Sequence, residues 1–250
     1  MEINKVALVT GGGRGIGASA VKLLAHEGYA ICINYVSDQE SATTLQQEVE
    51  SFGVKCIVVQ ADVSIEKDVE RLFNTVDREL GALNVLVNNA GILKQQSRME
   101  DISAERFSAI LQTNVMSCFL CSKAAVKRMS TRYGGLGGSI VNVSSGAAKS
   151  GSPNEYVDYA ASKGAMDTLT RGLAMEVADE GIRVNGVRPA LIYTEMHASG
   201  GEAGRVDRLS KNIPLKRGGE PHEVAEAIVW LASDKSSFVT GSFIDTTGGL

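Results

Sequence analysis

A glycine-rich loop between the first apolar run and the first helical pattern constrains this chain most. Residues 5–10 (KVALVT) are typical of a buried strand, and residues 15–27 carry apolar side chains at helical spacing. Between them lies TGGGRGIG, with glycines at positions 11, 15 and 17. Glycine allows positive φ and lets a ligand approach the backbone closely. The following helix N-terminus presents free N–H groups and partial positive charge, so we predict a pyrophosphate site.

Short apolar segments alternate with helical patterns along the rest of the chain. The predicted strands are 5–10, 29–35, 54–60, 83–87, 139–143, 183–187 and 242–245, and the predicted helices are 15–27, 38–52, 65–80, 101–132, 158–180 and 221–233. Strands that are apolar along most of their length are buried on both faces, which indicates a parallel sheet covered by helices. We therefore predict one α/β domain over 1–250, a Rossmann-type doubly wound sheet of about seven strands. Irregular residues 190–215 are predicted to form a substrate lid.

Charge and hydropathy limit the partners of the chain. The formal net charge is −4, and no run of like charges predicts binding to nucleic acid or to an acidic membrane. No apolar run approaches the roughly 18–20 residues that a membrane span requires. Residues 1–5 lead directly into a strand without the pattern of a secretory signal, so we expect a cytoplasmic protein.

The cysteines allow one alternative chemistry. Cys118-x-x-Cys121 has the spacing of a redox or zinc motif, and the two remaining cysteines are Cys32 and Cys56. The pair lies in an apolar helical pattern and lacks a second ligand pair at zinc-site spacing. Burial as small core residues is the favoured interpretation, and we predict no metal site.

The glycine spacing G-x-x-x-G-x-G and the motifs after it resemble the short-chain dehydrogenase/reductase family. In chain order these motifs are Asp62, Asn88-Asn89-Ala90-Gly91, Asn114, Ser144-Ser145, Tyr159, Lys163, Asn185 and Pro189, and together they extend over essentially the whole chain. The chain is most similar to the bacterial sugar (glucose 1-) dehydrogenases and the 3-oxoacyl-acyl-carrier-protein reductases of that family. The resemblance implies an oxidoreductase that moves a hydride between a nicotinamide cofactor and the carbonyl or alcohol group of a small substrate.

Tyr159 and Lys163 lie four residues apart, on one face of the predicted helix. The ordinary tyrosine pKa of about 10 is too high for proton transfer at neutral pH, and a nearby cation lowers it. We therefore expect Tyr159 to act as the acid/base, with Lys163 lowering its pKa and binding the nicotinamide ribose. Tyr156 is excluded because the residue four positions further on is alanine.

The resemblance supplies two further catalytic residues. It assigns the substrate oxygen to the second serine of the pair, Ser145, with Ser144 as the alternative. It also assigns Asn114 to a water molecule that connects Lys163 to solvent, although a buried asparagine that caps a neighbouring strand would give the same sequence. The expected catalytic set is Asn114, Ser145, Tyr159 and Lys163.

The resemblance likewise assigns the cofactor contacts. Asp62 fits the adenine amino group, Val63 is expected to pack on the ring, and Asn88 with Gly91 closes the adenosine side. The other expected cofactor residues are Gly11, Arg14, Gly15, Ile16, Gly17, Asn34, Ser37, Ala90, Tyr159, Lys163, Pro189, Ile192 and Thr194. The family's usual glycine after the proline is Ala190 here, which leaves the turn before Thr194 open.

NADP(H) is the expected cofactor, and NAD(H) remains the alternative. NAD enzymes of this fold usually carry an acidic residue at the end of the second strand, where this chain has Tyr35. Asp38 lies three residues further on, so no carboxylate is expected to repel a 2′-phosphate. Arg14 can supply a charge-assisted bond to that phosphate, with Asn34 and Ser37 as additional donors.

The predicted helices 101–132 and 158–180 carry more apolar positions than one sheet face buries. These positions include Met116, Phe119, Met166, Leu169 and Leu173. In the family such helices pair across a two-fold axis to give a dimer, which doubles again through the C-terminal strand, so a homotetramer is expected. A catalytically silent NADP(H)-binding sensor or scaffold is the alternative to an enzyme. The tyrosine–lysine pair argues against it, since binding alone does not need that pair.

Overall fold

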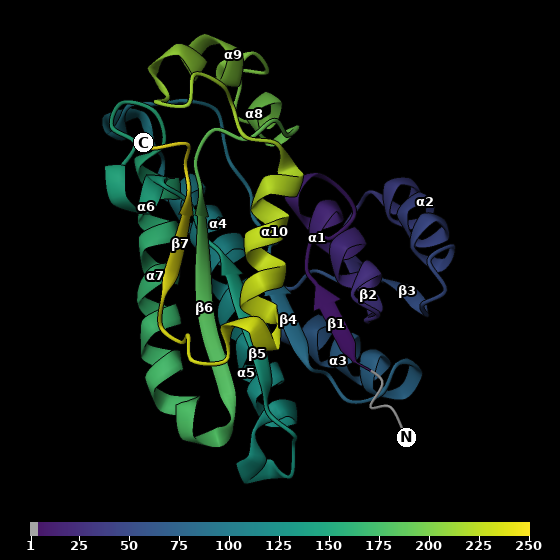
Figure 1. The fold of residues 1–250 in the computed structure, drawn as a ribbon. Coiled ribbons are helices and arrows are strands. Elements are labelled where there is room, and N and C mark those ends of the chain that lie inside the picture. Colours follow the sequence, from purple (N-terminus) through teal and green to yellow (C-terminus); the bar gives the residue numbers. More distant parts are fainter. Residues whose placement is uncertain (1–4) are drawn as a thin grey trace.

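Seven parallel strands form a central sheet with helices on both faces (Figure 1). The computed structural model describes residues 5–250. The strands are β1 (Val6–Val9), β2 (Ala30–Tyr35), β3 (Cys56–Gln60), β4 (Val85–Asn88), β5 (Gly138–Val143), β6 (Ile182–Pro189) and β7 (Phe243–Thr246), in the order β3-β2-β1-β4-β5-β6-β7. The helices are α1 (Gly15–His26), α2 (Gln39–Glu50), α3 (Glu66–Glu79), α4 (Ala104–Leu111), α5 (Ser117–Met129), α6 (Ala147–Ser150), α7 (Val157–Val177), α8 (Met196–Ser199), α9 (Arg205–Leu209) and α10 (Pro221–Ala232). The predicted single doubly wound domain is confirmed.

Two apolar cores hold the helices against the sheet. On one face, side chains of α1, α2 and α10, such as Leu24 and Ile228, pack against β1, β2 and β5. On the other face, α3, α5 and α7 bury Phe73 and Cys121 against the same sheet. β1 and β4 are neighbours in register, with Leu8 opposite Leu86. Strands that follow β1 are added on one side of it up to β3, and from β4 onward they are added on the other side, so the strand order reverses here. Ligands of such sheets bind outside the carboxyl ends of the strands at this position.

The predicted helix 101–132 is interrupted in the structure. It begins at Ala104 as α4, passes through the π-helical turn Gln112–Met116 and continues as α5 to Met129. Asn114 lies inside this turn, and π-helical turns are frequent at functional sites. Residues 190–215 are less irregular than predicted, because they contain α8, α9 and the short 3-10 helix Ser210–Asn212.

One finding on membranes differs from the prediction. The run Ala104–Met129 is long and apolar enough to cross a membrane by length and composition alone, with a mean hydropathy of 1.2 over an 18-residue window. Its α5 portion instead packs Leu120, Cys121 and Ala125 into the core beneath β4.

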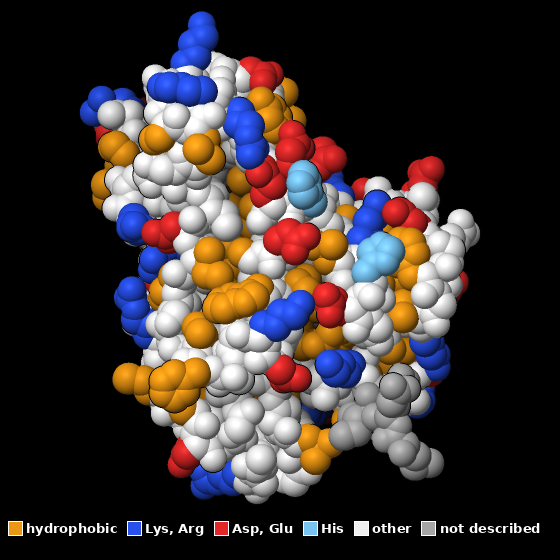
Figure 2. Space-filling view, in the orientation of Figure 1, with side chains coloured by type: hydrophobic (Ala, Val, Ile, Leu, Met, Phe, Trp, Pro, Cys, Tyr) orange, Lys and Arg blue, Asp and Glu red, His pale blue; other side chains and the backbone are white. Residues whose placement is uncertain are grey.

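Basic and acidic side chains are interspersed over the face of the molecule drawn in Figure 2.

The cysteines are all buried and none is paired in a disulfide. Burial raises the pKa of Cys118 to about 11, which disfavours the thiolate that redox chemistry or metal binding would need. Among residues 5–250, no cluster of three or more His, Cys, Asp or Glu side chains could hold a metal ion. The signal-sequence interpretation rested largely on residues 1–4, which lie outside the described part of the chain.

Candidate active site

The glycine loop joins β1 to α1 at the carboxyl edge of the sheet. Gly11 and Gly15 have φ values of +57° and +55°, which L side chains rarely adopt, so glycine is required at both positions. The α1 N-terminus has no side-chain cap and no acidic residue in its first turn. Its free N–H groups therefore remain available to an anion.

Two side chains that the sequence analysis did not single out hold this loop in place. The Thr10 hydroxyl accepts hydrogen bonds from the backbone N–H groups of Asn89 and Ala90, both at 3.0 Å. Asn89 Nδ2 donates to the backbone carbonyls of Thr10 and Gly11 at 3.0 and 2.9 Å. A Cβ on Gly17 would lie 2.5 Å from this Nδ2 atom and 2.6 Å from the Gly11 carbonyl oxygen. We call these hydrogen bonds of Thr10 and Asn89 the clamp. The absence of a side chain at Gly17 leaves space for the clamp as well as for helix packing.

The loop faces the segment that follows β6. A Cβ on Gly15 would lie 3.3 Å from Thr194 Cγ2, so Thr194 stands directly opposite the loop. At the end of β4, a Cβ on Gly91 would lie 3.4 Å from Asn114 Oδ1 and 3.6 Å from Lys163 Nζ. The structure therefore brings predicted residues from the ends of β1 and β4, the π-helical turn Gln112–Met116 and α7 together around one site.

The adjacent serines after β5 have different surroundings. Ser144 is 3% exposed and directs its hydroxyl to the Lys163 carbonyl at 3.4 Å. Ser145 is only half-buried, accepts a hydrogen bond from Ala147 N–H at 3.1 Å and donates to the Pro189 carbonyl at 3.5 Å. Ser145 is the serine placed beside Tyr159, which agrees with the choice made from the resemblance.

Tyr159 and Lys163 lie in the first turns of α7. Lys163 is 3% exposed, donates to the Val143 carbonyl at 2.7 Å and has its Nζ atom 5.6 Å from the centroid of the Tyr159 ring. Burial raises the pKa of Tyr159 to about 12, and the neighbouring Ser145 hydroxyl acts in the opposite direction. Burial also lowers the pKa of Lys163 to about 8. In the protein without cofactor, burial is therefore the largest influence on the pKa of Tyr159, and the expected lowering of this pKa by Lys163 stays a prediction.

Tyr156 occupies a different position from Tyr159. It is 4% exposed and donates its hydroxyl hydrogen to the Gly200 carbonyl at 3.2 Å, beneath the segment that contains α8. The guanidinium carbon of Arg205 lies 5.2 Å from the centroid of its ring. Tyr156 therefore supports the 190–215 segment.

The Asn114 side chain is fully engaged by protein atoms. Its Oδ1 atom accepts from Ile92 N–H at 2.8 Å, and its Nδ2 atom donates to the Ile92 carbonyl at 3.1 Å and to Ser162 Oγ at 3.0 Å. The side chain joins the β4 loop to α7 and so has the structural role that the sequence left open. A role for Asn114 in holding water stays a prediction.

Three expected cofactor residues have side chains that are directed into the protein, so only their backbone could contact a ligand, and their roles stay predictions. Asn34 is 1% exposed, and its amide nitrogen donates to three backbone carbonyls, of which the Ala61 carbonyl is nearest at 2.9 Å. Asn88 is 3% exposed and donates to Ser122 and Asn142 inside the core. Val63, also 3% exposed, packs in the core on the α3 side. Their side chains are occupied by packing that no local pattern reveals.

The remaining adenosine-side residues are accessible. Asp62 is half-buried, and its Oδ1 atom accepts two hydrogen bonds from Ser64. Arg14 and Ser37 are exposed, and Arg14 forms no ion pair within the described chain. Asp38 caps α2, where hydrogen bonds from Ser41 hold its pKa below the ordinary value and the charge of Arg14 acts in the same direction.

The end of β6 and the segment after it contain the expected cofactor residues Pro189, Ile192 and Thr194. The Pro189 carbonyl accepts from Gly146 N–H at 2.8 Å, which links β6 to α6. Ile192 is 5% exposed, so its side chain belongs to the core and only its backbone could contact a ligand. Its carbonyl contacts His197 Nε2 at 3.0 Å.

The residues present fit a dinucleotide cofactor. Two glycines at positive φ and an uncapped helix N-terminus form a cradle without side chains, as a pyrophosphate requires. A cationic side chain, Lys163, lies near Gly91 at the other end of the site. A doubly wound sheet with this cradle beside a serine, a tyrosine and a lysine defines the class of nucleotide-dependent oxidoreductases.

Comparisons with known proteins agree with this class. A family model described as Enoyl-(Acyl carrier protein) reductase matches residues 11–250. The uncharacterized oxidoreductase YgfF of Escherichia coli (strain K12) is 58% identical over 244 residues, covering 98% of this chain and 99% of that protein. The 3-oxoacyl-acyl-carrier-protein reductase FabG of Staphylococcus epidermidis (strain ATCC 35984) is 34% identical over 248 residues, covering 99% of each chain.

A solved structure extends the likeness to three dimensions. The short chain dehydrogenase from Burkholderia cenocepacia J2315, crystallised in complex with NADP, superposes with a TM-score of 0.90. The two are 31% identical, and the match covers 98% of this chain and 97% of that chain. The chain belongs to the short-chain dehydrogenase/reductase family. It is an oxidoreductase of the kind that acts on CH–OH groups with NAD(P).

Proposed function

We propose that this oxidoreductase uses NADP(H) to interconvert a carbonyl group and an alcohol on a small substrate, with Tyr159 as the acid/base. The observation that carries the proposal is the convergence of Ser145, Tyr159 and Lys163 beside the glycine cradle. When bound, the nicotinamide supplies or accepts the hydride. Substrate positioning, proton transfer and ribose binding are assigned to side chains of this protein.

Each of the three side chains has one task in this proposal. Ser145 holds the substrate oxygen, and Tyr159 gives that oxygen a proton in the reductive direction or takes one in the oxidative direction. Because burial raises its pKa to about 12, Tyr159 is protonated at neutral pH and ready to donate. Lys163 binds the ribose, and its positive charge favours the phenolate that oxidation requires.

The test is a substrate panel combined with a matched serine pair. NADPH and NADH oxidation is measured with aldehydes, ketones, sugars and 3-oxoacyl thioesters, and the reverse reaction is measured with the corresponding alcohols. Ser145→Ala should lower kcat by roughly 100-fold, since it removes one donor to the substrate oxygen. Ser144→Ala should leave kcat within a few-fold of wild type. Tight cofactor binding without turnover of any substrate would instead favour the catalytically silent sensor.

The preference for NADP(H) is supported by the charges around Arg14. Arg14 is exposed at the helix N-terminus, and Tyr35 stands where an acidic residue would select NAD(H). Asp38 is turned to the capping of α2. The solved relative with NADP bound supports the same preference. The Asn34 side chain points into the protein, so Arg14 and Ser37 are the proposed contacts of the 2′-phosphate. NAD(H) remains the alternative cofactor.

We also propose that residues 190–215 form a substrate lid. Arg205 is 9% exposed and pairs with Glu155 through two contacts, Nη1 to Oε1 at 2.8 Å and Nη2 to Oε2 at 2.5 Å. Gln96 donates to Glu202 at 2.8 Å. These bonds connect the segment to the loop before α7 and to the loop after β4, so opening the segment would require them to break.

A homotetramer is the proposed assembly. A groove of about 710 Å³ runs between α5 and α7, lined by Phe119, Leu169 and Leu173 and by lysines and glutamates. Met175 is 81% exposed beside it on α7. Met166, expected to contribute, is fully buried and cannot. Phe119→Glu should reduce the mass measured by light scattering, and a wild-type monomer at micromolar concentration would contradict the proposal.

A further inference from the structure

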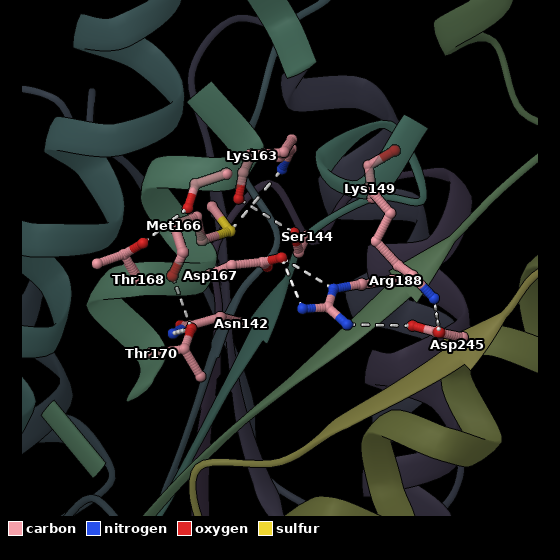
Figure 3. Close-up of polar contacts among 12 residues, drawn as sticks. Asn142, Ser144, Lys149, Lys163, Met166, Asp167, Thr168, Thr170, Arg188 and Asp245 are labelled. Carbon is pink, nitrogen blue, oxygen red and sulfur yellow. Dashed lines mark hydrogen bonds and ion pairs between the residues drawn. The ribbon is translucent and has the colours of Figure 1, made fainter. Parts of the chain in front are cut away.

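Four charged side chains, one each from α6, α7, β6 and β7, form a continuous set of contacts (Figure 3). Asp167 lies on α7 one turn after Lys163, Arg188 directly precedes Pro189 on β6, Asp245 lies on β7 and Lys149 on α6. Arg188 Nε and Nη2 both contact Asp167 Oδ2 at 2.8 Å, and Nη1 contacts Asp245 Oδ1 at 3.4 Å. Lys149 Nζ contacts Asp245 Oδ2 at 2.9 Å. We call Asp167, Arg188, Asp245 and Lys149 the charge chain.

The inner half of the charge chain is buried. Asp167 is 6% exposed and Arg188 is 8% exposed, and the Arg188 guanidinium lies 3.8 Å from the centroid of the Phe243 ring. Desolvation largely offsets the attraction within a buried ion pair, so stability alone explains such a pair poorly. Its position next to the catalytic lysine suggests another role.

Asp167 is the anion that accompanies two buried cations, Lys163 and Arg188. Lys163 donates to a neutral group, the Val143 carbonyl, so no carboxylate touches it directly. Asp167 uses Oδ2 for both Arg188 contacts, and its Oδ1 atom is buried without a hydrogen-bond partner among residues 5–250. If this carboxylate were absent, Lys163 would lose the anion that lies one turn along its helix, and Arg188 would keep only its 3.4 Å contact with Asp245.

We propose that Asp167 is a positioning residue that keeps Lys163 cationic for the reaction, and that the rest of the charge chain holds this carboxylate ionised and in place. The inference rests on the proposed function, because the role of Lys163 belongs to that function. Arg188 also adjoins Pro189, whose carbonyl accepts from Ser145, so the charge chain reaches both sides of the catalytic set.

The groups that act on Lys163 come from several elements. Tyr159 shares its helix, Cys118 reaches it from α5, and Asp167 follows one turn later. Burial lowers the pKa of Lys163 to about 8, while Cys118 and Asp167 oppose this decrease. Asp167 faces Arg188 from β6, and Arg188 in turn contacts Asp245 from β7, which pairs with Lys149 from α6. One further cation is close: the Arg171 guanidinium of α7 lies 5.1 Å from the centroid of the Phe243 ring, which Arg188 also contacts.

The test measures the charge of Lys163 directly, without substrate. Full-length protein is labelled with ¹³C at lysine Cε, the Lys163 signal is assigned with Lys163→Arg, and its titration midpoint is followed by NMR. Asp167→Asn should lower the midpoint by roughly half to one pH unit, less than the shift expected from direct contact. Asp167→Glu, which keeps the charge, should restore most of the wild-type midpoint. An unchanged midpoint in Asp167→Asn would overturn the proposal.

Two further measurements keep the test decisive. If Asp167→Asn does not fold, Asp245→Asn replaces it at the half-buried end of the charge chain, and its midpoint must fall by a smaller amount. No fall would refute the proposal. Where turnover is found, the high-pH limb of kcat/KM should move with the midpoint. A midpoint that moves in a protein without turnover on any substrate would support the electrostatic role and contradict the proposed function.

Discussion

The two sides of the candidate active site are built from different atoms. On the β1–α1 side, ligand-facing groups are backbone N–H groups, exposed by glycines and fixed by Thr10 and Asn89. On the β5–α7 side, they are side chains, and Tyr159 and Lys163 are displaced from their ordinary pKa values by burial. The first side offers groups that bind but do not titrate, whereas the second carries the side chains that are proposed to move protons. Substitutions on the two sides should therefore affect different measurements.

The largest effect is expected on the side-chain half. Tyr159→Phe should lower kcat by about 10²- to 10⁴-fold, since it removes the transferable proton. Cofactor affinity, measured by fluorescence or calorimetry, should stay within a few-fold of wild type. Tyr156→Phe is the matched control, because that hydroxyl is bonded to Gly200. Near-normal turnover in Tyr159→Phe, or equal losses in both variants, would remove the contrast between the two sides.

On the backbone half, the decisive variant adds one methyl group. Gly17→Ala would place a Cβ 2.5 Å from Asn89 Nδ2, so the clamp and the loop must shift. Overpacking of this kind costs about 1–3 kcal/mol, which corresponds to roughly 10- to 100-fold weaker cofactor binding if the strain falls on the loop.

Gly164→Ala on α7 serves as its control. A Cβ there meets nothing within 4 Å, so this variant should be neutral or slightly more stable. Unchanged cofactor affinity in Gly17→Ala would show that the loop is not held as rigidly as its contacts imply.

The titration of Lys163 gives a third expectation, measured as stability. Its folded pKa of about 8 lies below its ordinary value of 10.5, so the unfolded chain keeps a proton that the folded chain has released. Stability must therefore rise with pH across that window. Between pH 8 and 10, the unfolding free energy of wild type should gain about 2 kcal/mol relative to Lys163→Met.

Chemical denaturation at several pH values measures this difference. Lys22→Met on α1 is the comparison, since that side chain is 41% exposed and pairs with Glu48 at the surface. A difference between wild type and Lys163→Met that stays flat with pH would mean that Lys163 is not buried as a titrating group.

The smallest effect concerns cofactor choice. Arg14→Ala should weaken NADP(H) binding by about three- to tenfold and leave NAD(H) unchanged, because it removes one charge-assisted bond to the 2′-phosphate. Lys22→Ala removes another exposed cation from α1 and should affect neither cofactor selectively. Equal losses for both cofactors in Arg14→Ala, or a wild-type preference for NAD(H), would contradict the assignment.

Much of the fold and part of the site could be predicted from the sequence. Strand and helix order followed from apolar periodicity, and the seven-stranded sheet has the predicted parallel topology. Glycine at positions 11 and 15 favoured a turn with positive φ, and both residues have positive φ in the structure. The π-helical turn at Asn114 could not be predicted, because its inserted residue leaves the helical pattern nearly unchanged.

The sequence by itself determined which residue types reach the carboxyl edge of the sheet, because strand ends and glycine turns are local properties. Tertiary structure alone decided between neighbours: Asn89 clamps the loop while Asn88 enters the core, and Ser145 borders the site while Ser144 faces α7. Tertiary structure also buries Tyr159, which raises the pKa of its hydroxyl above the ordinary tyrosine value. Adjacent residues point in different directions, and burial depends on every element packed around a side chain, so neither can be read from one segment of chain.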